Sequence, residues 1–384
     1  MPDVVVIGAG ISGAAAAYEL ARDGLDVVLL DRYGPAAMAS GWTLAGVRQS
    51  GRHPAELPLA RAAVAEWETL AARLDGRTEY RRHGNLRLAR NEPEVAVIRR
   101  LVDEQSAAGL DIAFLPDAAS VRTVAPAISP RVLAASFCPS DGHADPHATV
   151  NSFVAAAERR GVRLRFGERV RAIETANGRV IGVVTDAGRI AAPRVVLAAG
   201  VFANELLDPL GLAIPLTVPM VTVLRSAPGA TVLEQVIGVA NADCAGRQEA
   251  DGRFRVTSGL APWHQEIVEG ATPAIHPGAA SIAETVTLFS EVVPAFGDAR
   301  IKAIWAGLID LTPDALPVLD APEAVAGLVI GAGFSGHGFC LGPVTGRILA
   351  DLAQDRAPVL PISPFRLARF AGWNAPAEPP SLHG

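Results

Sequence analysis

The residues of this sequence best suited to chemistry are glycines that follow an apolar run near the amino terminus. Gly8, Gly10 and Gly13 form the pattern G-x-G-x-x-G, and an acidic residue, Asp31, ends the next apolar run. The first glycine of such a pattern allows a tight turn, the second lets a pyrophosphate approach backbone N–H groups at a helix start, and the third lets helix and strand pack closely. A carboxylate placed like that of Asp31 can bond a ribose hydroxyl. We therefore predict a dinucleotide site here; a glycine-rich turn without a ligand is the alternative.

A second glycine-rich run stands near the carboxyl end, in the stretch VIGAGFSGHGFCLGP from Val329 to Pro343. One phosphate site explains a single run of this kind, so the second run needs its own explanation. An internal duplication is one alternative. It is disfavoured because FSGHGFCLGP continues with glycines and Pro343, whereas the first run continues into alanines.

A third set of residues could suggest a metal site, because His143, Asp145 and His147 alternate in the stretch DGHADPHATV. No fourth ligand is nearby, and an aspartate followed by a proline, here Asp145 and Pro146, is typical of a helix start. We therefore predict a capped helix at this point and no metal site.

The apolar pattern predicts the elements that hold these residues. We expect a strand at Val4 to Ile7, a helix ending near Gly24 and a second strand ending at Asp31, which together form a parallel β-α-β unit. Another strand is expected within residues 80–89, and a hairpin is expected to turn at ANGR. Further helices are predicted at about 55–74, 94–107, 279–292 and 342–354. Segments of β character between about 215 and 300 indicate a second domain.

Composition sets limits on the class of protein. The chain has 384 residues, of which 50% are hydrophobic, enough to fill the cores of two ordinary domains. A formal net charge of −6 argues against a nucleic-acid surface, which needs clustered Lys and Arg. No apolar stretch approaches the ~20 residues of a membrane span, and the amino terminus lacks the charged start of a signal peptide. Three widely spaced cysteines suit a reducing compartment, so we expect a cytoplasmic protein.

Five segments taken in order, VIGAGISG, DGHADP, VVLAAG, WAGLIDLTPDALPVLD and GFSGHGF, resemble the D-amino acid oxidase superfamily of FAD-dependent oxidoreductases, in its glycine oxidase and sarcosine oxidase branch. The resemblance spans nearly the whole chain. It implies an α/β fold with a glutathione-reductase-type, FAD-binding, Rossmann-like domain and a second, antiparallel-sheet α+β substrate domain. We assign residues 1–80, 141–214 and 301–374 to the discontinuous FAD-binding domain, 81–140 and 215–300 to the substrate domain, and 375–384 to a disordered tail.

The resemblance also implies which residues contact FAD. The pyrophosphate would meet the first glycine run and Ser40, and the adenine would meet the backbone of Val170. The second glycine run would bring backbone amides to the flavin ring, where they can stabilise negative charge. The implied cofactor-binding residues are Gly8, Gly10, Ile11, Ser12, Gly13, Asp31, Arg32, Ser40, Ala45, Gly46, Val170, Ala199, Gly200, Gly307, Gly333, Phe334, Gly336, His337, Gly338 and Phe339. No cysteine lies in WAGLIDLTPD, where some sarcosine oxidases tether flavin, so FAD is expected to be noncovalent.

The chemistry implied by the resemblance is oxidation of a C–N bond by hydride transfer to flavin N5, which gives an imine that hydrolyses. A guanidinium can grip a substrate carboxylate with two bonds, although arginines at solvated surface positions are the alternative. The candidate catalytic residues are Arg48, Arg52, His53 and His337. Other candidate pocket walls are Trp263, His264 and Trp305.

The predicted substrate is a small molecule, either an amino acid or a secondary amine. The run GVRQSGRHPAELPLA resembles the FAD subunits of opine and hydroxyproline dehydrogenases, which implies partner subunits. The strand RFRVTSGL lacks the lysine that sarcosine oxidases place near the flavin to activate oxygen, which favours a dehydrogenase. Two alternatives stay open. They are a NAD-dependent dehydrogenase, supported by the first glycine run alone, and an FAD-binding subunit without catalysis of its own.

Overall fold

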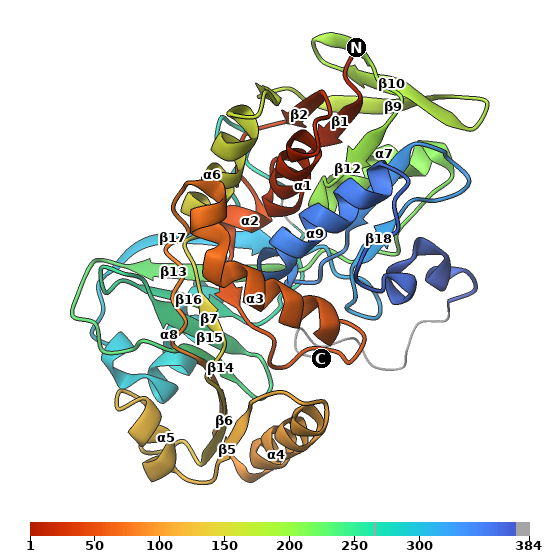
Figure 1. Cartoon of the computed structure of the whole chain (residues 1–384). Coiled ribbons are helices and arrows are strands. Elements are labelled where there is room, and N and C mark those ends of the chain that lie inside the picture. Colours follow the sequence, from red (N-terminus) through yellow and green to blue (C-terminus); the bar gives the residue numbers. More distant parts are fainter. Residues whose placement is uncertain (265, 374–384) are drawn as a thin grey trace.

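A computed structural model describes residues 1–264 and 266–373 of the chain, arranged around two large sheets (Figure 1). The tail predicted to be disordered, 375–384, lies outside the described residues. None of the helices within the described ranges is long and apolar enough to span a membrane.

The first sheet has six strands and contains the predicted β-α-β unit. Strand β1 (Val4–Ile7) pairs in parallel with β2 (Val27–Asp31) and β12 (Val195–Leu197), and the helix α1 (Ile11–Arg22) connects β1 to β2. Parallel pairing continues to β8 (Arg163–Phe166) and β19 (Leu328–Ala332), and β18 (Val318–Asp320) joins β19 in the antiparallel direction. The order across the sheet is β18 (Val318–Asp320), β19 (Leu328–Ala332), β12 (Val195–Leu197), β1 (Val4–Ile7), β2 (Val27–Asp31) and β8 (Arg163–Phe166). The central strands are apolar throughout because helices or loops cover both of their faces.

Helices α1 and α9 (Gly338–Ala353) lie side by side on one face of this sheet (Figure 1). Glycines permit their close approach, since a Cβ at Gly346 would stand 2.4 Å from the Cβ of Ala15. Helix α9 begins at Gly338, earlier than the predicted start at 342, and contains Pro343 in its interior. Tertiary contacts hold this early first turn despite the proline, because the indole of Trp67 donates a hydrogen bond of 2.9 Å to the carbonyl of Cys340.

A three-stranded antiparallel sheet follows β8 in the chain. It contains β9 (Val170–Ala176), β10 (Arg179–Thr185) and β11 (Gly188–Ala191). The predicted turn between β9 and β10 is confirmed, since Asn177 and Gly178 both have positive φ, which suits a tight hairpin.

The second large sheet has eight strands and collects segments far apart in the sequence. Its order is β17 (Ile301–Leu308), β13 (Met220–Ser226), β16 (Phe254–Ser258), β15 (Cys244–Gln248), β14 (Val236–Val239), β4 (Asn85–Ala89), β6 (Ala134–Cys138) and β5 (Ala113–Leu115). Only the pairing of β14 with β4 is parallel among these. Strand β17, which we assigned to the FAD-binding segment 301–374, instead extends this sheet by pairing along its length with β13. A continuous ladder of backbone hydrogen bonds determines its place, and the strand pattern alone does not reveal the partner.

The remaining helices cover the edges and faces of the two sheets. They are α2 (Ala39–Trp42), α3 (Leu57–Leu74), α4 (Glu92–Ala107), α5 (Ala118–Val124), α6 (Pro146–Glu158), α7 (Ala203–Leu207) and α8 (Ala279–Val292). The predicted start of α6 is confirmed, because the carboxylate of Asp145 accepts a hydrogen bond of 2.7 Å from the N–H of Ala148. A short ladder, β3 (Gly46–Val47) with β7 (Gly142–His143), ties the loop after α2 to the loop before α6.

Candidate functional site

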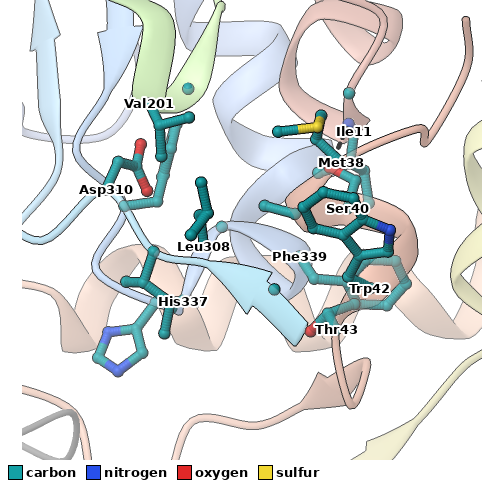
Figure 2. Close-up of a pocket in the computed structure, with 18 of the residues that line it drawn as sticks. Ile11, Met38, Ser40, Trp42, Thr43, Val201, Leu308, Asp310, His337 and Phe339 are labelled. Atoms are coloured by element: carbon teal, nitrogen blue, oxygen red, sulfur yellow. Dashed lines mark hydrogen bonds between the residues drawn. The ribbon is translucent and has the colours of Figure 1, made fainter. Parts of the chain in front are cut away.

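A cavity lies between the two large sheets. One side is formed by the carboxyl ends of β1 and β2 and the first residues of α1 and α9, and the other by strands of the eight-stranded sheet. Figure 2 shows Leu308 between Asp310 and Val201 on one side and Trp42 and Phe339 on the other. The carboxyl ends of parallel strands are where open α/β sheets commonly bind ligands.

The first glycine run has the geometry expected for a dinucleotide. A Cβ at Gly8 would lie 2.2 Å from the carbonyl oxygen of Ala198, and one at Gly13 would lie 1.9 Å from that of Gly8. Both glycines therefore permit close backbone packing, and Gly8 also has a φ of +107°. Gly10 differs, because it lines the cavity and a Cβ there would meet only Ser40, with its Oγ at 3.1 Å.

Ser40 holds the start of α1 at the cavity. Its Oγ accepts a hydrogen bond of 3.0 Å from the N–H of Ile11, and both residues line the cavity together with Ser12. The N-cap residue Gly10 has no side chain to do this. The helix start therefore presents backbone N–H groups and the positive end of its dipole to the cavity, an arrangement that suits a phosphate.

Asp31 lines the cavity but also organises the surrounding turn. Its Oδ2 accepts a hydrogen bond of 2.7 Å from the N–H of Ala9, and its Oδ1 accepts bonds of 2.8 and 2.9 Å from the N–H groups of Tyr33 and Gly34. Burial raises the pKa of this carboxyl. A carboxylate oxygen can accept more than one bond, so the predicted contact with a ribose hydroxyl stays a prediction.

Beyond Asp31, the cavity is bordered by an arginine stacked on an aromatic ring. The guanidinium of Arg32 lies 3.9 Å from the ring centre of Phe202 and forms an ion pair of 2.9 Å with Glu205. Val170, Ala199 and Gly200 line this same cavity, as the prediction for the adenosine end of FAD requires.

The second glycine run brings another helix start to the cavity. Gly336, with a φ of +84°, precedes His337, the N-cap of α9, and Gly338 and Phe339 follow it; all four line the cavity. Two helix starts, those of α1 and α9, thus border one cavity. This answers why the chain has two glycine runs, since each supplies partial positive charge to a different part of the same space.

Asp310 is a buried carboxyl at the cavity that our sequence prediction did not include. Its Oδ2 accepts a hydrogen bond of 2.7 Å from the N–H of Gly333, and burial raises its pKa to about 6. Gly333 itself does not line the cavity, and a Cβ there would stand 2.5 Å from a methyl carbon of Thr312. Gly333 therefore packs closely next to Asp310, and its predicted contact with FAD stays a prediction.

The imidazole of His337 is directed to Glu56 rather than to the centre of the cavity. Figure 2 shows its ring pointing away from Leu308 and Trp42, and its Nδ1 lies 2.9 Å from Oε2 of Glu56. Burial, followed by the charge of Arg52, lowers the pKa of His337. Although burial alone would raise it, His337 and Arg52 bring the pKa of Glu56 below its usual range. A neutral imidazole that donates to an ionised Glu56 helps to position the start of α9, and the catalytic role of His337 stays a prediction.

Arg48 and Arg52 both line the cavity, as predicted, and His53 does not. Nη1 of Arg48 donates a hydrogen bond of 2.7 Å to the carbonyl of Ser50, and Nε of Arg52 donates one of 3.2 Å to the carbonyl of Arg48. Burial, and then the charges of Arg52 and Arg87, lower the pKa of Arg48 to about 9, so it keeps its charge at neutral pH. His53 is exposed.

Asp141, from the motif DGHADP, fixes the segment that carries Arg48. This fully buried carboxyl accepts hydrogen bonds from the N–H groups of Gln49, at 2.8 Å, and Ser50, at 3.2 Å, and also from the hydroxyl of Ser50. Burial raises its pKa. Asp141 thus positions Arg48 without itself lining the cavity.

Some of the other predicted residues line the cavity, and others lie behind the lining residues or outside the cavity. Gly46 and Gly307 line the cavity, whereas Ala45 is buried behind it with a φ of +60°. Trp305 donates from Nε1 to the carbonyl of Trp42 at 3.2 Å, and it is Trp42 that lines the cavity. Trp263 and His264 are not among the lining residues, and His264 is exposed.

The wall residues missed by sequence reasoning include Trp42, Asn85 and Arg87. Arg87 carried a signal, since it is a charged residue inside the apolar strand NLRLA.

The residues of this cavity fit FAD. The space beside Gly10 and the helix start would receive the pyrophosphate, and the lining extends from Val170 at one end to the second helix start at the other. Cys138, Cys244 and Cys340 are buried, and none is among the lining residues. Within the described ranges, no group of three or more His, Cys, Asp and Glu side chains is arranged to hold a metal ion.

Comparison with known proteins agrees with this geometry. Residues 3–352 match the family described as FAD dependent oxidoreductase (DAO). D-amino acid dehydrogenase from Sinorhizobium medicae is 26% identical, over 96% of this chain and 99% of its own length. The structure of L-amino acid deaminase from Proteus vulgaris, with its specific insertion sequence deleted, is 26% identical with a TM-score of 0.83, covering 96% of this chain and 94% of the other. Glycine oxidase from Geobacillus kaustophilus is 23% identical, with a TM-score of 0.89, and shows the same fold. The match covers 96% of this chain and 98% of the other.

Proposed function

Because the chain belongs to the FAD dependent oxidoreductase family, we propose that it oxidises the C–N bond of an amino acid or a related secondary amine. The observation that carries this proposal is the position of Arg48, which lines the cavity together with the second helix start and strands of the eight-stranded sheet. A guanidinium there can bind a carboxylate with paired hydrogen bonds. Relatives named D-amino acid dehydrogenase and L-amino acid deaminase support the same substrate class.

The protein's own residues would bind and orient the substrate. Arg48 holds the carboxylate, and Asp141 fixes the loop that carries Arg48, so that the neighbouring C–H bond has one orientation. Val221, Val223 and Val236 form part of an apolar wall that excludes water from the reacting carbon. Bound FAD supplies the acceptor for the hydride that leaves this carbon. The nitrogen lone pair then forms the C=N bond, the N–H proton passes to water, and the imine hydrolyses.

The family match over residues 3–352 favours FAD over the nicotinamide alternative. We propose that FAD is noncovalent, since no cysteine lines the cavity among the described residues. We favour a dehydrogenase over an oxidase, because the single lysine of the sequence, Lys302, is exposed on β17. The resemblance of the run GVRQSGRHPAELPLA favours partner subunits. The three free cysteines favour the cytoplasm.

The proposal is tested by Arg48→Lys, which keeps the charge but loses the paired donors. A charge-assisted hydrogen bond contributes about 1.5–3 kcal/mol, so kcat/KM for a reactive amino acid should fall about 10- to 150-fold. FAD content should stay unchanged. Arg52→Lys is the matched comparison and should cost less, because the guanidinium of Arg52 lies 3.8 Å from Glu56 and serves that ion pair.

Wild-type turnover in Arg48→Lys would place the carboxylate anchor elsewhere. An equal loss with an amine that has no carboxylate would do the same, because the effect would then not depend on the group that Arg48 is proposed to bind.

A further inference from the structure

Arg87, on β4, is a buried cation without a carboxylate partner. Its side chain is 9% exposed, and its Nε and Nη2 donate to the carbonyl oxygens of Val239, at 3.4 Å, and Ala240, at 3.0 Å. Across residues 1–264 and 266–373, no carboxylate lies within ion-pair distance of its guanidinium, and no hydrogen bond is formed by its Nη1. Buried charges in proteins are normally paired, so this arrangement requires an explanation.

Neighbouring arginines show how unusual Arg87 is. Arg90, on the same segment, forms ion pairs of 2.8 Å with Glu94 and 2.7 Å with Asp243. Arg255 pairs with Glu249 at 2.9 Å. Arg247 is also buried against carbonyl oxygens, but it does not line the cavity between the sheets. Arg87 is therefore set apart by combining burial, the lack of a carboxylate and a place in the cavity wall.

The guanidinium of Arg87 converges with that of Arg48. A Cβ built on Gly51 would lie 3.0 Å from Nη1 of Arg48 and 3.4 Å from Nη1 of Arg87, so both groups reach the same point from different elements. The charge of Arg87 contributes to the lowered pKa of Arg48, after burial and Arg52. Burial alone lowers the pKa of Arg87 to about 10. Two arginines that line the cavity therefore bring their guanidinium groups close together.

The two carboxyls near Arg48, those of Glu56 and Asp141, do not form an ion pair with Arg87. Glu56 is held by His337, at 2.9 Å, and lies 3.8 Å from Arg52. Asp141 is occupied by the backbone and hydroxyl of the Gln49–Ser50 segment. The positive charge of Arg87 is thus left for a ligand in the cavity, whose other walls on the eight-stranded sheet are mainly aliphatic.

We propose that the substrate carries a second acidic group and that Arg87 binds it, while Arg48 binds the carboxylate next to the reacting carbon. This inference rests on the proposed function and narrows its substrate class to amino or imino diacids. The second carboxylate can stand on the side chain, as in glutamate, or on the nitrogen substituent, as in iminodiacetate. In either case Arg87 is a specificity-determining residue of the site.

The test uses the FAD-loaded protein and carboxylates that cannot be oxidised. Binding of glutarate and of butyrate is followed through the change each causes in the absorbance of oxidised flavin. Glutarate should bind the wild type at least about 10-fold more tightly than butyrate, because a charge-assisted hydrogen bond is added. This comparison needs no variant. Equal affinity for the two ligands would overturn the inference.

Variants then assign the effect to Arg87. Arg87→Gln keeps a donor toward the carbonyls and should remove the preference for glutarate while leaving butyrate binding intact. Arg87→Lys should restore part of the preference, and Arg48→Gln should weaken both ligands. Equal weakening of both ligands in Arg87→Gln would mean that Arg87 and Arg48 share one carboxylate, and the inference would fail.

Anaerobic reduction of the flavin shows whether the second carboxylate stands on the side chain or on the nitrogen substituent. It also distinguishes a failure of this inference from a failure of the proposed function. D- and L-glutamate and iminodiacetate should reduce it faster than D- and L-norvaline and N-methylglycine, and the faster acid identifies where the second carboxylate stands. Reduction by the monoacids alone would overturn this inference and leave the proposed function standing. No reduction by any of these compounds, with no binding of butyrate, would reject the proposed function itself.

Discussion

Replacing Gly10 by alanine should weaken FAD binding without unfolding the protein. Gly10 has a φ of −70°, which alanine adopts readily, and the added Cβ would meet only Ser40, with Oγ at 3.1 Å. The stability of the flavin-free protein should therefore change by less than about 1 kcal/mol. In the complex the methyl group would occupy space next to the pyrophosphate. Overpacking costs about 1–3 kcal/mol, which corresponds to a Kd for FAD about 5- to 150-fold weaker.

Two matched variants separate this effect from a packing defect. Gly13→Ala would place its Cβ 1.9 Å from the carbonyl oxygen of Gly8, so it should lower the stability of the flavin-free protein by roughly 2 kcal/mol or more. Gly34→Ala meets nothing within 4 Å and should change neither quantity. Urea unfolding of the flavin-free proteins and FAD titration by fluorescence quenching measure the two effects. Wild-type FAD affinity in a folded Gly10→Ala protein would refute the reasoning, because the pyrophosphate would then lie elsewhere.

Two further predictions concern buried carboxyls. Because burial raises the pKa of Asp310 from 3.8 to about 6, the folded flavin-free protein binds a proton there that the unfolded chain releases. As pH rises from about 4 to 6, the free energy of unfolding of the wild type should therefore fall relative to that of Asp310→Asn, by up to about 1.4 kcal/mol per pH unit. Urea unfolding measures both proteins, and a difference between them that does not depend on pH would contradict this prediction. Asp141→Asn removes an acceptor for the Gln49 and Ser50 amides, so KM for a carboxylate substrate should rise while FAD content is kept, and an unchanged KM would show that Asp141 does not position Arg48.

Local signals in the sequence predicted much of the FAD-binding part. The G-x-G-x-x-G run, flanked by apolar strands, located β1, α1 and β2, and the helix over Ala279–Val292 has the bounds that its pattern predicted. These elements depend on periodicity and turn residues, which a sequence displays directly. The predicted start of α9 at residue 342 is too late, because tertiary packing holds a helical turn before Pro343.

Contacts between distant segments could not be predicted in the same way. The place of β17 depends on a ladder with β13, and the environment of Arg87 depends on the parallel pairing of β4 with β14. The pair formed by His337 and Glu56 joins residues 281 positions apart. Each of these depends on which strands and helices become neighbours in space, which a single sequence does not encode in a short pattern.

The central claim is tested most directly by adding an amino acid to the isolated, FAD-loaded protein in the absence of oxygen. The account predicts that an amino or imino acid bleaches the flavin absorbance near ~450 nm, and that the same amine without its carboxylate does so far more slowly. Arg48→Lys should slow the bleaching while its flavin content remains that of the wild type. A flavin that no amino or imino acid bleaches would contradict the claim that this chain alone oxidises such substrates.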